Sequence, residues 1–452
     1  MEKTFSTLTL GCKLNQFETE WIRESLIRKN WQFRRFEDGA AFCIINSCTV
    51  TARSDARCRK AARRAKRTNP RSFVVVTGCY AETQRASLDG MEEVDLVLGN
   101  GEKSSIPAII DAIAERERGE PSADRGSVSR VGMAERSEID RFLDHTRAFV
   151  KVQEGCNASC SYCIVPRARG PSRSVPVAAI LDQVAILRES GYHEIVLSGV
   201  HIGRYGADLD PPDTLANLVE TILDRASDVR VRLSSIEMNE VTPRLLDLVR
   251  ATDRLAPHLH VPLQSGDDRI LEAMNRSYRA SGFRSKIEEI ARARNGIAIG
   301  TDIIVGFPGE TEASFENTFQ LVRDLPMSYF HVFGFSPRPQ TPAASMDGTV
   351  SPERKRARSA RLIELGNSKR HAFLESHVGS TQLALVQRPP HRCPSLVRSL
   401  TGTYCEVLLP KETGAPGSLV PVRVNGIHGG ILYGAPLGDD SFPRPATGAC
   451  TR

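Results

Sequence analysis

The alternation of strand-like and helix-like segments is the feature that most constrains the fold of this chain. Over the first hundred or so residues, short β-branched or apolar runs are separated by segments with helical periodicity. The predicted strands are Phe5–Leu10, Ala41–Ile45, Phe73–Thr77 and Val94–Leu98, and the predicted helices are Gln16–Arg28, Ala52–Arg67 and Ser104–Ala114. Such alternation is typical of a parallel sheet with helices on its faces, so we expect an α/β fold with an open parallel sheet in an N-terminal domain, residues 1–115.

The same alternation resumes after residues 116–147, a stretch rich in charge, Gly and Ser that predicts a linker. Six further strands are predicted at Ala148–Gln153, Glu194–Leu197, Arg230–Ser235, His258–Pro262, Ile297–Val305 and Tyr329–Phe335. Helical patterns between them include Val177–Glu189, Thr214–Asp224, Phe283–Arg294 and Glu312–Arg323. Six β/α units predict a partial (β/α)6 barrel over residues 148–373, because a closed barrel of this type has eight units.

The pattern changes near residue 375 to short strands with Gly and Pro between them. Thr381–Val386, Tyr404–Leu409 and Val420–Val424 predict a small β-barrel over residues 374–440. Such a module is compatible with an RNA-binding appendage and equally with a generic interaction domain.

Three cysteines directly follow the first strand of the predicted partial barrel. Cys156, Cys160 and Cys163 have the spacing Cys-x3-Cys-x2-Cys in QEGCNASCSYCIVPRARG, with no fourth cysteine or histidine close behind. A four-iron cluster is normally held by four thiolates, so three would leave one iron open for chemistry. A zinc knuckle is the alternative, although structural zinc usually has four ligands. The mouth of a barrel at the ends of its strands is where active sites are built.

Three other cysteines each follow a predicted strand of the N-terminal sheet. Cys12, Cys48 and Cys79 come just beyond the first, second and third strands. The carboxyl ends of parallel strands share one edge of a sheet, so these thiols are expected to converge although they are far apart in sequence. Cys43 and Cys58 are expected to be ordinary small buried residues.

Composition argues against a secreted or membrane protein. The 452 residues include 11 cysteines, an odd number, and the N-terminus has no apolar core of signal-peptide length, so structural disulfides are not expected. No run of 18 apolar residues occurs, so no membrane span is predicted. We expect a cytoplasmic protein with reduced thiols.

Basic residues are unevenly placed, although the net charge is only +6. Nine of them lie between Arg53 and Arg71 with a single acidic residue, Asp55, and a second basic run extends from Arg354 to Arg370. Such runs are compatible with solvated helix faces or with a polyanionic partner such as RNA.

Taken together, these motifs resemble the radical S-adenosylmethionine superfamily, in which an aromatic residue such as Tyr162 precedes the last cysteine. GCKLNQFETE, INSCTVT and TGCYA, followed by the Cys156 motif and the terminal β module, are similar to the methylthiotransferases over essentially the full chain. GCK followed by Asn and Glu-Thr, with HVFGFSPRPQTPAA later, most resembles the MtaB-like branch, which acts on N6-threonylcarbamoyladenosine in tRNA. The terminal module would then be TRAM-like.

This resemblance implies the cofactors and their binding residues. Two [4Fe-4S] clusters would be held by the two sets of three cysteines, and S-adenosyl-L-methionine would bind the open iron beside Cys156, Cys160 and Cys163. Candidate contacts to S-adenosylmethionine are Tyr162, Gly199, Glu237 and Gln264, and Arg338 is a candidate to bind the threonyl carboxylate of the substrate. Each of these residues also has an ordinary structural reading, as a core aromatic, a turn former or a polar strand end.

In the family the radical made from S-adenosylmethionine removes hydrogen from C2 of the adenine, and a methylthio group assembled at the second cluster is transferred there. The expected partners are the tRNA anticodon stem-loop, an electron donor such as flavodoxin or ferredoxin, and a sulfur donor, with the enzyme a monomer. The target base at position 37 is unpaired, so it can be splayed into a pocket.

Other functions remain open from the sequence. Isopentenyladenosine in tRNA and an aspartate of a ribosomal protein are alternative substrates, and a non-catalytic zinc-binding or RNA-binding protein is the alternative class. Gln340 stands where glycine is usual in the family, and Met238 where proline is common. Both departures fall on the substrate side and leave the six cysteines untouched.

Overall fold

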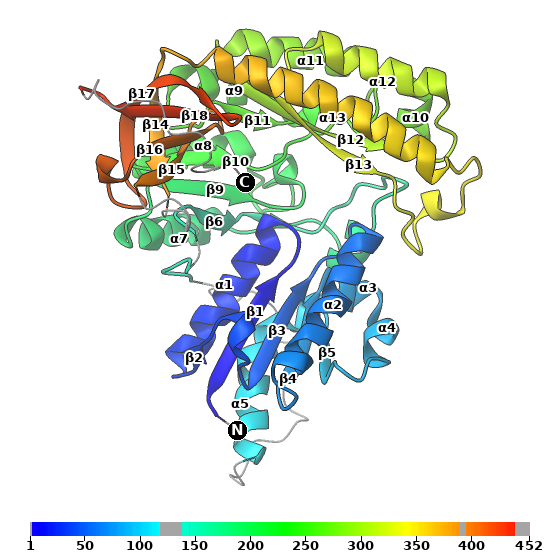
Figure 1. Ribbon diagram of the computed structural model, residues 1–452, viewed down its shortest axis with the longest axis vertical. Coiled ribbons are helices and arrows are strands. Elements are labelled where there is room, and N and C mark those ends of the chain that lie inside the picture. Colours follow the sequence, from blue (N-terminus) through cyan, green and yellow to red (C-terminus); the bar gives the residue numbers. More distant parts are fainter. Residues whose placement is uncertain (1, 118–137, 144, 388–394, 439–452) are drawn as a thin grey trace.

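The computed structural model describes residues 2–117, 138–143, 145–387 and 395–438, and these form three units (Figure 1). An N-terminal parallel sheet, a central partial barrel and a small closed barrel follow one another along the chain. The predicted α/β class and all three architectures are confirmed. Within the described ranges, no helix is both long and apolar enough to cross a membrane.

The N-terminal sheet has five parallel strands in the order β2-β1-β3-β4-β5. The strands are β1 (Thr4–Thr9), β2 (Gln32–Phe33), β3 (Phe42–Ser47), β4 (Phe73–Gly78) and β5 (Leu96–Leu98). The helices are α1 (Lys13–Arg28), α2 (Ala52–Thr68), α3 (Cys79–Thr83), α4 (Arg85–Asp89) and α5 (Ile106–Glu117), with short 3-10 turns at Phe36–Asp38 and Asn100–Ser105. Apolar clusters lie on both faces of the sheet, as expected for a doubly covered parallel sheet. The two-residue edge strand β2 is too short to show a sequence pattern.

The central unit is a partial barrel of six parallel strands. They are β6 (Ala148–Lys151), β9 (Glu194–Ser198), β10 (Arg230–Leu233), β11 (His258–His260), β12 (Ala298–Val305) and β13 (Tyr329–Gly334). Two three-stranded sheets, β10-β9-β6 and β11-β12-β13, are joined by the bridge between Ser235 and His260. All six predicted strands are therefore present, with β6 and β13 at the open edges.

Helices cover the outside of this barrel. They are α7 (Val177–Glu189), α8 (Leu215–Arg225), α9 (Pro243–Ala251), α11 (Ala280–Ala293), α12 (Glu312–Asp324) and the long α13 (Pro352–Glu375), with the shorter α6 (Val165–Arg169) and α10 (Asp268–Ala273). Two strands of two residues each, β7 (Gln153–Glu154) and β8 (Arg173–Ser174), pair in antiparallel fashion at the two ends of the segment that contains the cysteine loop.

Most of the predicted linker lies outside the described residues, but its last part packs on the core. The amide side chain of Gln183 accepts a hydrogen bond from the Ile139 backbone at 2.9 Å and donates one back to its carbonyl at 2.8 Å. Ile139 and Phe142 are fully buried. Ile139 and Phe142 thus belong to the apolar core of the central unit.

The C-terminal unit is a closed barrel in the strand order β14-β15-β16-β18-β17. Its strands are β14 (Thr381–Val386), β15 (Leu396–Thr401), β16 (Glu406–Pro410), β17 (Leu419–His428) and β18 (Ile431–Pro436). The sequence predicted three of the five, and β15 and β18 were missed.

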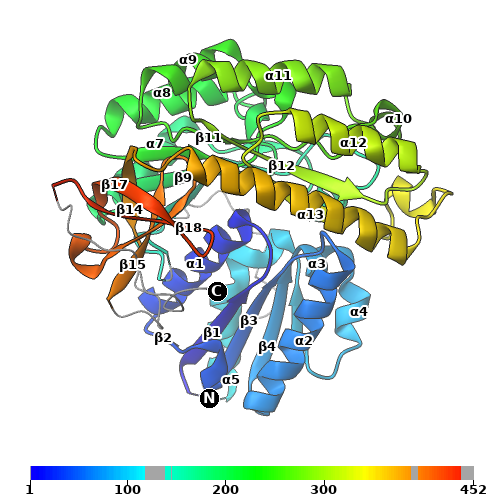
Figure 2. The same cartoon turned by 45° about the horizontal axis from the view of Figure 1, so that its top comes forward.

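This small barrel docks on the N-terminal ends of the core strands (Figure 2). Arg230 donates to the Leu383 carbonyl at 2.7 Å, and Arg232 donates to the Gly402 carbonyl at 2.8 Å. Glu194 is fully buried and pairs with both guanidinium groups. The small barrel therefore lies at the end of the core opposite the Cys156 loop.

Candidate active site

The loop that carries Cys156, Cys160 and Cys163 runs from β7 to α6 at the carboxyl end of β6. Gly155 has φ +71°, and a Cβ there would lie 1.9 Å from the Pro171 carbonyl oxygen, so only glycine fits. The loop is closed by a backbone hydrogen bond from Cys156 to the Gly170 carbonyl at 3.1 Å. All three cysteines are partly buried.

Two of these thiols have cationic neighbours. His201 Nδ1 lies 3.4 Å from Cys156 Sγ, and Arg276 donates to Cys160 Sγ at 3.3 Å. Burial opposes ionisation of Cys156, but its hydrogen bond with His201 lowers its pKa below the usual value. Burial raises the pKa of Cys163 to about 12. Thiolates are the form that binds iron, so the cationic neighbours of Cys156 and Cys160 suit those two thiols to a metal–sulfur cluster, whereas the buried Cys163 would lose its proton only on binding the metal.

Of the four residues predicted to contact S-adenosylmethionine, Tyr162 lies in this loop, and Glu237 and Gly199 are linked to it through other side chains. Glu237 forms an ion pair with Arg276, which also contacts Cys160. At Gly199 a Cβ would lie 3.0 Å from the Gln153 carbonyl, and Gln153 in turn accepts from the backbone of His201. Tyr162 packs against the small apolar cluster around Met274 and Phe307, and Gln264 has φ +66° beside β12. Their roles stay predictions.

The three N-terminal cysteines also converge, as the sheet topology predicted. Cys12 directly precedes α1, Cys48 follows β3 and Cys79 begins α3 after β4. A Cβ at Gly11, which has φ +106°, would lie 3.1 Å from Cys48 Sγ. Burial raises the pKa of Cys48, and the nearby thiols of Cys79 and Cys12 act in the same direction.

Asn15 holds the two turns of this second site together. Its amide nitrogen donates to the Leu10 carbonyl at 2.8 Å and to the Ser47 carbonyl at 2.9 Å. These carbonyls belong to the segments that lead into Cys12 and Cys48. The asparagine of the GCKLNQ motif is thus a support for the thiol site.

Arg169 links the two thiol sites through a buried network. It donates to Glu18 at 2.7 Å and to Asn15 at 2.6 Å in the N-terminal domain, and to Glu154 at 3.0 Å in the core. Glu18 also pairs with the buried Lys103. Sequence reasoning did not assign Arg169, although it lies in the quoted VPRARG segment. The signal in the sequence that could have identified Arg169 is its position as a charged residue just after the three cysteines.

A second interdomain contact lies at Cys79. The amide nitrogen of Asn100 donates to the Ala168 carbonyl at 2.5 Å and lies 3.9 Å from Cys79 Sγ. Ala168 directly precedes Arg169 in α6. The loop of the first thiol site therefore packs directly on the second.

Arg338 is also buried at the interdomain boundary. It forms an ion pair with Asp55 and donates to Thr49 Oγ1 at 3.1 Å, while its Nε has no hydrogen-bond partner among the described residues. Its role in binding a substrate carboxylate stays a prediction. Gln340, two residues later, has φ +71°, which explains why glycine suits this position. Met238 is buried.

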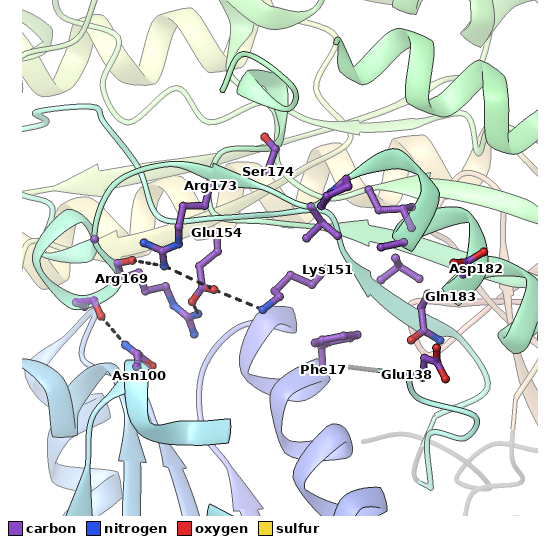
Figure 3. Close-up of a pocket in the computed structure, with 18 of the residues that line it drawn as sticks. Phe17, Asn100, Glu138, Lys151, Glu154, Arg169, Arg173, Ser174, Asp182 and Gln183 are labelled. Atoms are coloured by element: carbon purple, nitrogen blue, oxygen red, sulfur yellow. Dashed lines mark hydrogen bonds and ion pairs between the residues drawn. The ribbon is translucent and has the colours of Figure 1, made fainter. Parts of the chain in front are cut away.

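A cavity of about 1000 Å³ lies between the N-terminal domain and the core, beside Arg169 of α6 (Figure 3). Phe17 and Asn100 line it from one side, and Lys151, Glu154 and Arg173 from the other. Lys151 and Arg173 both pair with Glu154, at 3.4 and 3.8 Å. None of its described lining residues is a cysteine, so the cavity adjoins the network of Arg169 and is separate from the thiols.

Two family models match the chain. The radical SAM superfamily matches residues 150–322, and the uncharacterized protein family UPF0004 matches residues 4–99. These ranges contain the two sets of three cysteines, one in each.

Curated relatives cover most of the chain. The threonylcarbamoyladenosine tRNA methylthiotransferase MtaB of Bacillus subtilis is 38% identical and aligns with 96% of this chain and 95% of its own length. The MtaB of Aquifex aeolicus is also 38% identical, over 84% of this chain and 91% of its own. The tRNA-2-methylthio-N(6)-dimethylallyladenosine synthase of Methylacidiphilum infernorum is 32% identical, over 95% of this chain and 94% of its own.

A solved structure supports the fold alone. The radical S-adenosylmethionine methyltransferase TsrM from Kitasatospora setae, with tryptophan and a SAM analogue bound, superposes with a TM-score of 0.54 at 14% identity, over 76% of this chain and 75% of its own.

The relatives and the family models confirm the predicted enzyme class and its cofactors, S-adenosylmethionine and [4Fe-4S] clusters. The prediction that the enzyme methylthiolates tRNA is confirmed, and the nucleoside that it modifies stays a prediction. The chain therefore belongs to the radical S-adenosylmethionine methylthiotransferases that modify tRNA.

Proposed function

We propose that this enzyme methylthiolates C2 of N6-threonylcarbamoyladenosine at position 37 of tRNA and so forms the 2-methylthio derivative. The observation that carries the proposal is the pair of converging three-thiol sites, one in each of two domains, clamped together by Arg169. The choice of substrate is supported by the two relatives at 38% identity, which are both threonylcarbamoyladenosine enzymes. Other threonylcarbamoyladenosine enzymes are 31–35% identical, and the dimethylallyladenosine enzymes are 32% identical.

Each three-thiol site would hold one four-iron cluster with one iron left open. Cys156, Cys160 and Cys163 would hold the cluster that binds S-adenosylmethionine, with Arg276 and His201 balancing the thiolate charge. Cys12, Cys48 and Cys79 would hold the second. When bound, these groups supply radical formation and sulfur delivery. The residues of the chain hold the two sites at a fixed separation and orient the base between them.

S-adenosylmethionine would lie at the mouth of the core barrel. Tyr162 would face its adenine, the backbone beside Gly199 its methionine end, and Glu237 and Gln264 its polar groups. The close approach that Gly199 permits and the left-handed backbone at Gln264 support this assignment. Arg338 would meet the threonyl carboxylate through its unpartnered Nε.

The basic residues of α2 would contact the phosphates of the anticodon stem-loop. Arg57, Lys60 and Arg67 are exposed and form no ion pair with any described residue. Unpaired exposed cations are available to displace the counterions of RNA. The small C-terminal barrel, TRAM-like in its position, would supply further contacts. An electron donor such as flavodoxin or ferredoxin, a sulfur donor, a monomeric state and a cytoplasmic location complete the proposal.

Mass spectrometry of tRNA nucleosides from cells that lack the gene tests the function. The expected result is loss of the 2-methylthio derivative of N6-threonylcarbamoyladenosine with accumulation of the unmethylthiolated nucleoside. Restoration by the intact gene, and not by a Cys156→Ala variant, is the matched control. Loss of the isopentenyl counterpart instead would assign the enzyme to the other tRNA branch, and unchanged nucleosides would point to a protein substrate.

A further inference from the structure

Three side chains on neighbouring strands of the core meet on the inner face of the barrel, and none of them belongs to either set of three thiols. They are His260 at the end of β11, Asp302 in β12 and His331 in β13. Asp302 and His331 are register partners on adjacent strands, so their side chains leave the same face of the sheet. His260 lies opposite Gly300, two residues before Asp302 and on that same face.

The ligand atoms of these residues are spaced as a small divalent ion requires. Asp302 Oδ1 lies 3.2 Å from His260 Nε2 and 3.1 Å from His331 Nδ1, and all three atoms lie within 4.8 Å of one another. Nitrogen and oxygen ligands at about 2.0–2.2 Å from a zinc ion, at angles near tetrahedral, are about 3.3–3.6 Å apart. The observed spacing therefore needs little movement to accept an ion.

The hydrogen bonds around His260 point in the same direction. Its Nδ1 lies 2.8 Å from Ser235 Oγ, which fixes the ring. Its Nε2 is buried and, although Asp302 is close, has no well-aligned hydrogen bond in the described part of the chain. A metal-binding histidine typically has this arrangement, with one ring nitrogen held by a neighbour and the other directed at the ion.

Access to the three side chains is also suitable. Arg232, on β10, donates to the buried Glu194, which is its carboxylate partner. His331 is 53% exposed, so solvent reaches the open side of the set. Two histidines and one carboxylate leave coordination positions free, as in metal sites that take a further ligand.

We propose that His260, Asp302 and His331 form a site for a divalent transition metal such as zinc, separate from the two iron–sulfur sites. The ion would be held on the inner wall of the barrel, with its remaining positions open to water or to an oxygen ligand. The proposal does not depend on which tRNA nucleoside the enzyme modifies, because zinc binding can be measured without tRNA.

Zinc binding to the holoenzyme tests the proposal. The enzyme with both clusters in place is equilibrated anaerobically with Zn²⁺, passed over a weak chelating resin and analysed for zinc and iron per chain. We expect about one zinc and about eight irons. Zinc K-edge absorption should show a first shell of nitrogen and oxygen without sulfur. A sulfur shell would place the zinc on cluster cysteines and overturn the proposal.

Two variants and one control separate binding from folding. His331→Ala and Asp302→Asn should each lower bound zinc at least tenfold and leave iron content unchanged. Phe333→Leu changes an exposed residue two positions along the same face of β13 and should retain zinc. His331→Ala is expected to fold because the side chain is half exposed. Retention of zinc by both variants, or no zinc on the unaltered enzyme, would refute the site.

Discussion

Arg169 donates a hydrogen bond of 2.7 Å to Glu18 across the boundary between the core and the N-terminal domain. Both side chains are almost completely buried, at 2% and 1% exposure. Burial would raise the pKa of Glu18, but the charge of Arg169 and then of Lys103 lowers it well below its usual range. The pair stays ionised, and it fixes the position of one thiol site relative to the other.

We predict that Arg169→Gln uncouples the two halves of the reaction. The clusters should still assemble, since neither set of thiols is removed, and cleavage of S-adenosylmethionine should persist. Methylthio transfer should fall about 100-fold, because small misplacements of reacting groups have effects of this size. The ratio of methylthiolated product to 5′-deoxyadenosine measures the uncoupling. Arg167→Gln, an exposed change in the same helix, is the control. An unchanged ratio in Arg169→Gln would contradict this role.

The pairing of Arg338 with Asp55 allows the carboxylate-binding role of Arg338 to be separated from a structural one. Removing one partner of a buried ion pair costs about 3–5 kcal/mol, so Arg338→Gln and Asp55→Asn should each destabilise the interdomain contact. If Arg338 also binds the threonyl carboxylate, only Arg338→Gln should raise KM for tRNA that carries threonylcarbamoyladenosine. Equal effects of the two changes on KM would assign Arg338 to the interface alone.

The sequence predicted most of the strands because local patterns determine them, and the placement of Cys12, Cys48 and Cys79 after those strands follows from the same patterns. The role of the six cysteines as cluster ligands stays a prediction. Alternating apolar runs identify buried parallel strands, and cysteines after those strands share a sheet edge. Prediction failed for β15 and β18, which are completed by pairing in a closed barrel, and for β2, which has only two residues.

The supporting residues of the site were harder to predict. Arg169, Asn15 and Asn100 acquire their roles from contacts between domains, such as that of Arg169 with Asn15 over 154 positions of sequence. Arg338 shows the reverse case, since its sequence position suggested a substrate contact and the structure adds a partner, Asp55, from the N-terminal domain. No local pattern carries information of this kind.

We predict that the exposed basic side chains of α2 contribute to tRNA binding by contacting its phosphate groups. Arg57→Gln, Lys60→Gln and Arg67→Gln together should weaken binding and should make the slope of log affinity against log salt shallower, by roughly 0.7–0.9 for each phosphate that is no longer neutralised. Affinity measured by filter binding across salt concentrations checks this. Arg63 and Arg64 are ion-paired with Glu93 and Glu37, so Arg63→Gln with Arg64→Gln is the matched control and should change the slope less. Equal slopes for the triple variant and the unaltered enzyme would show that the basic face of α2 is exposed to solvent and does not contact tRNA.

The docking of the small C-terminal barrel should depend on pH through Glu194. Burial alone would raise the pKa of this carboxyl, but Arg230 and Arg232 outweigh it and lower the pKa from 4.5 to about 2. A lowered carboxyl pKa adds stability that is fully present above the unfolded value, near 4.5, and is lost as the pH falls toward 2.

Glu194→Gln should therefore loosen the small barrel at neutral pH and matter little in acid. The same two arginines also hold the Leu383 and Gly402 carbonyls of that barrel, so their release should expose β15 and its neighbours. Amide hydrogen exchange of residues 396–410, corrected for the intrinsic effect of pH, should be faster in Glu194→Gln at pH 7. The difference from the unaltered enzyme should shrink between pH 4.5 and pH 2. Glu220→Gln, which removes an exposed ion pair of α8 with Arg244, is the control and should leave this exchange unchanged at every pH. A difference that persists at the lowest pH would show that the carboxylate charge does not hold the two units together.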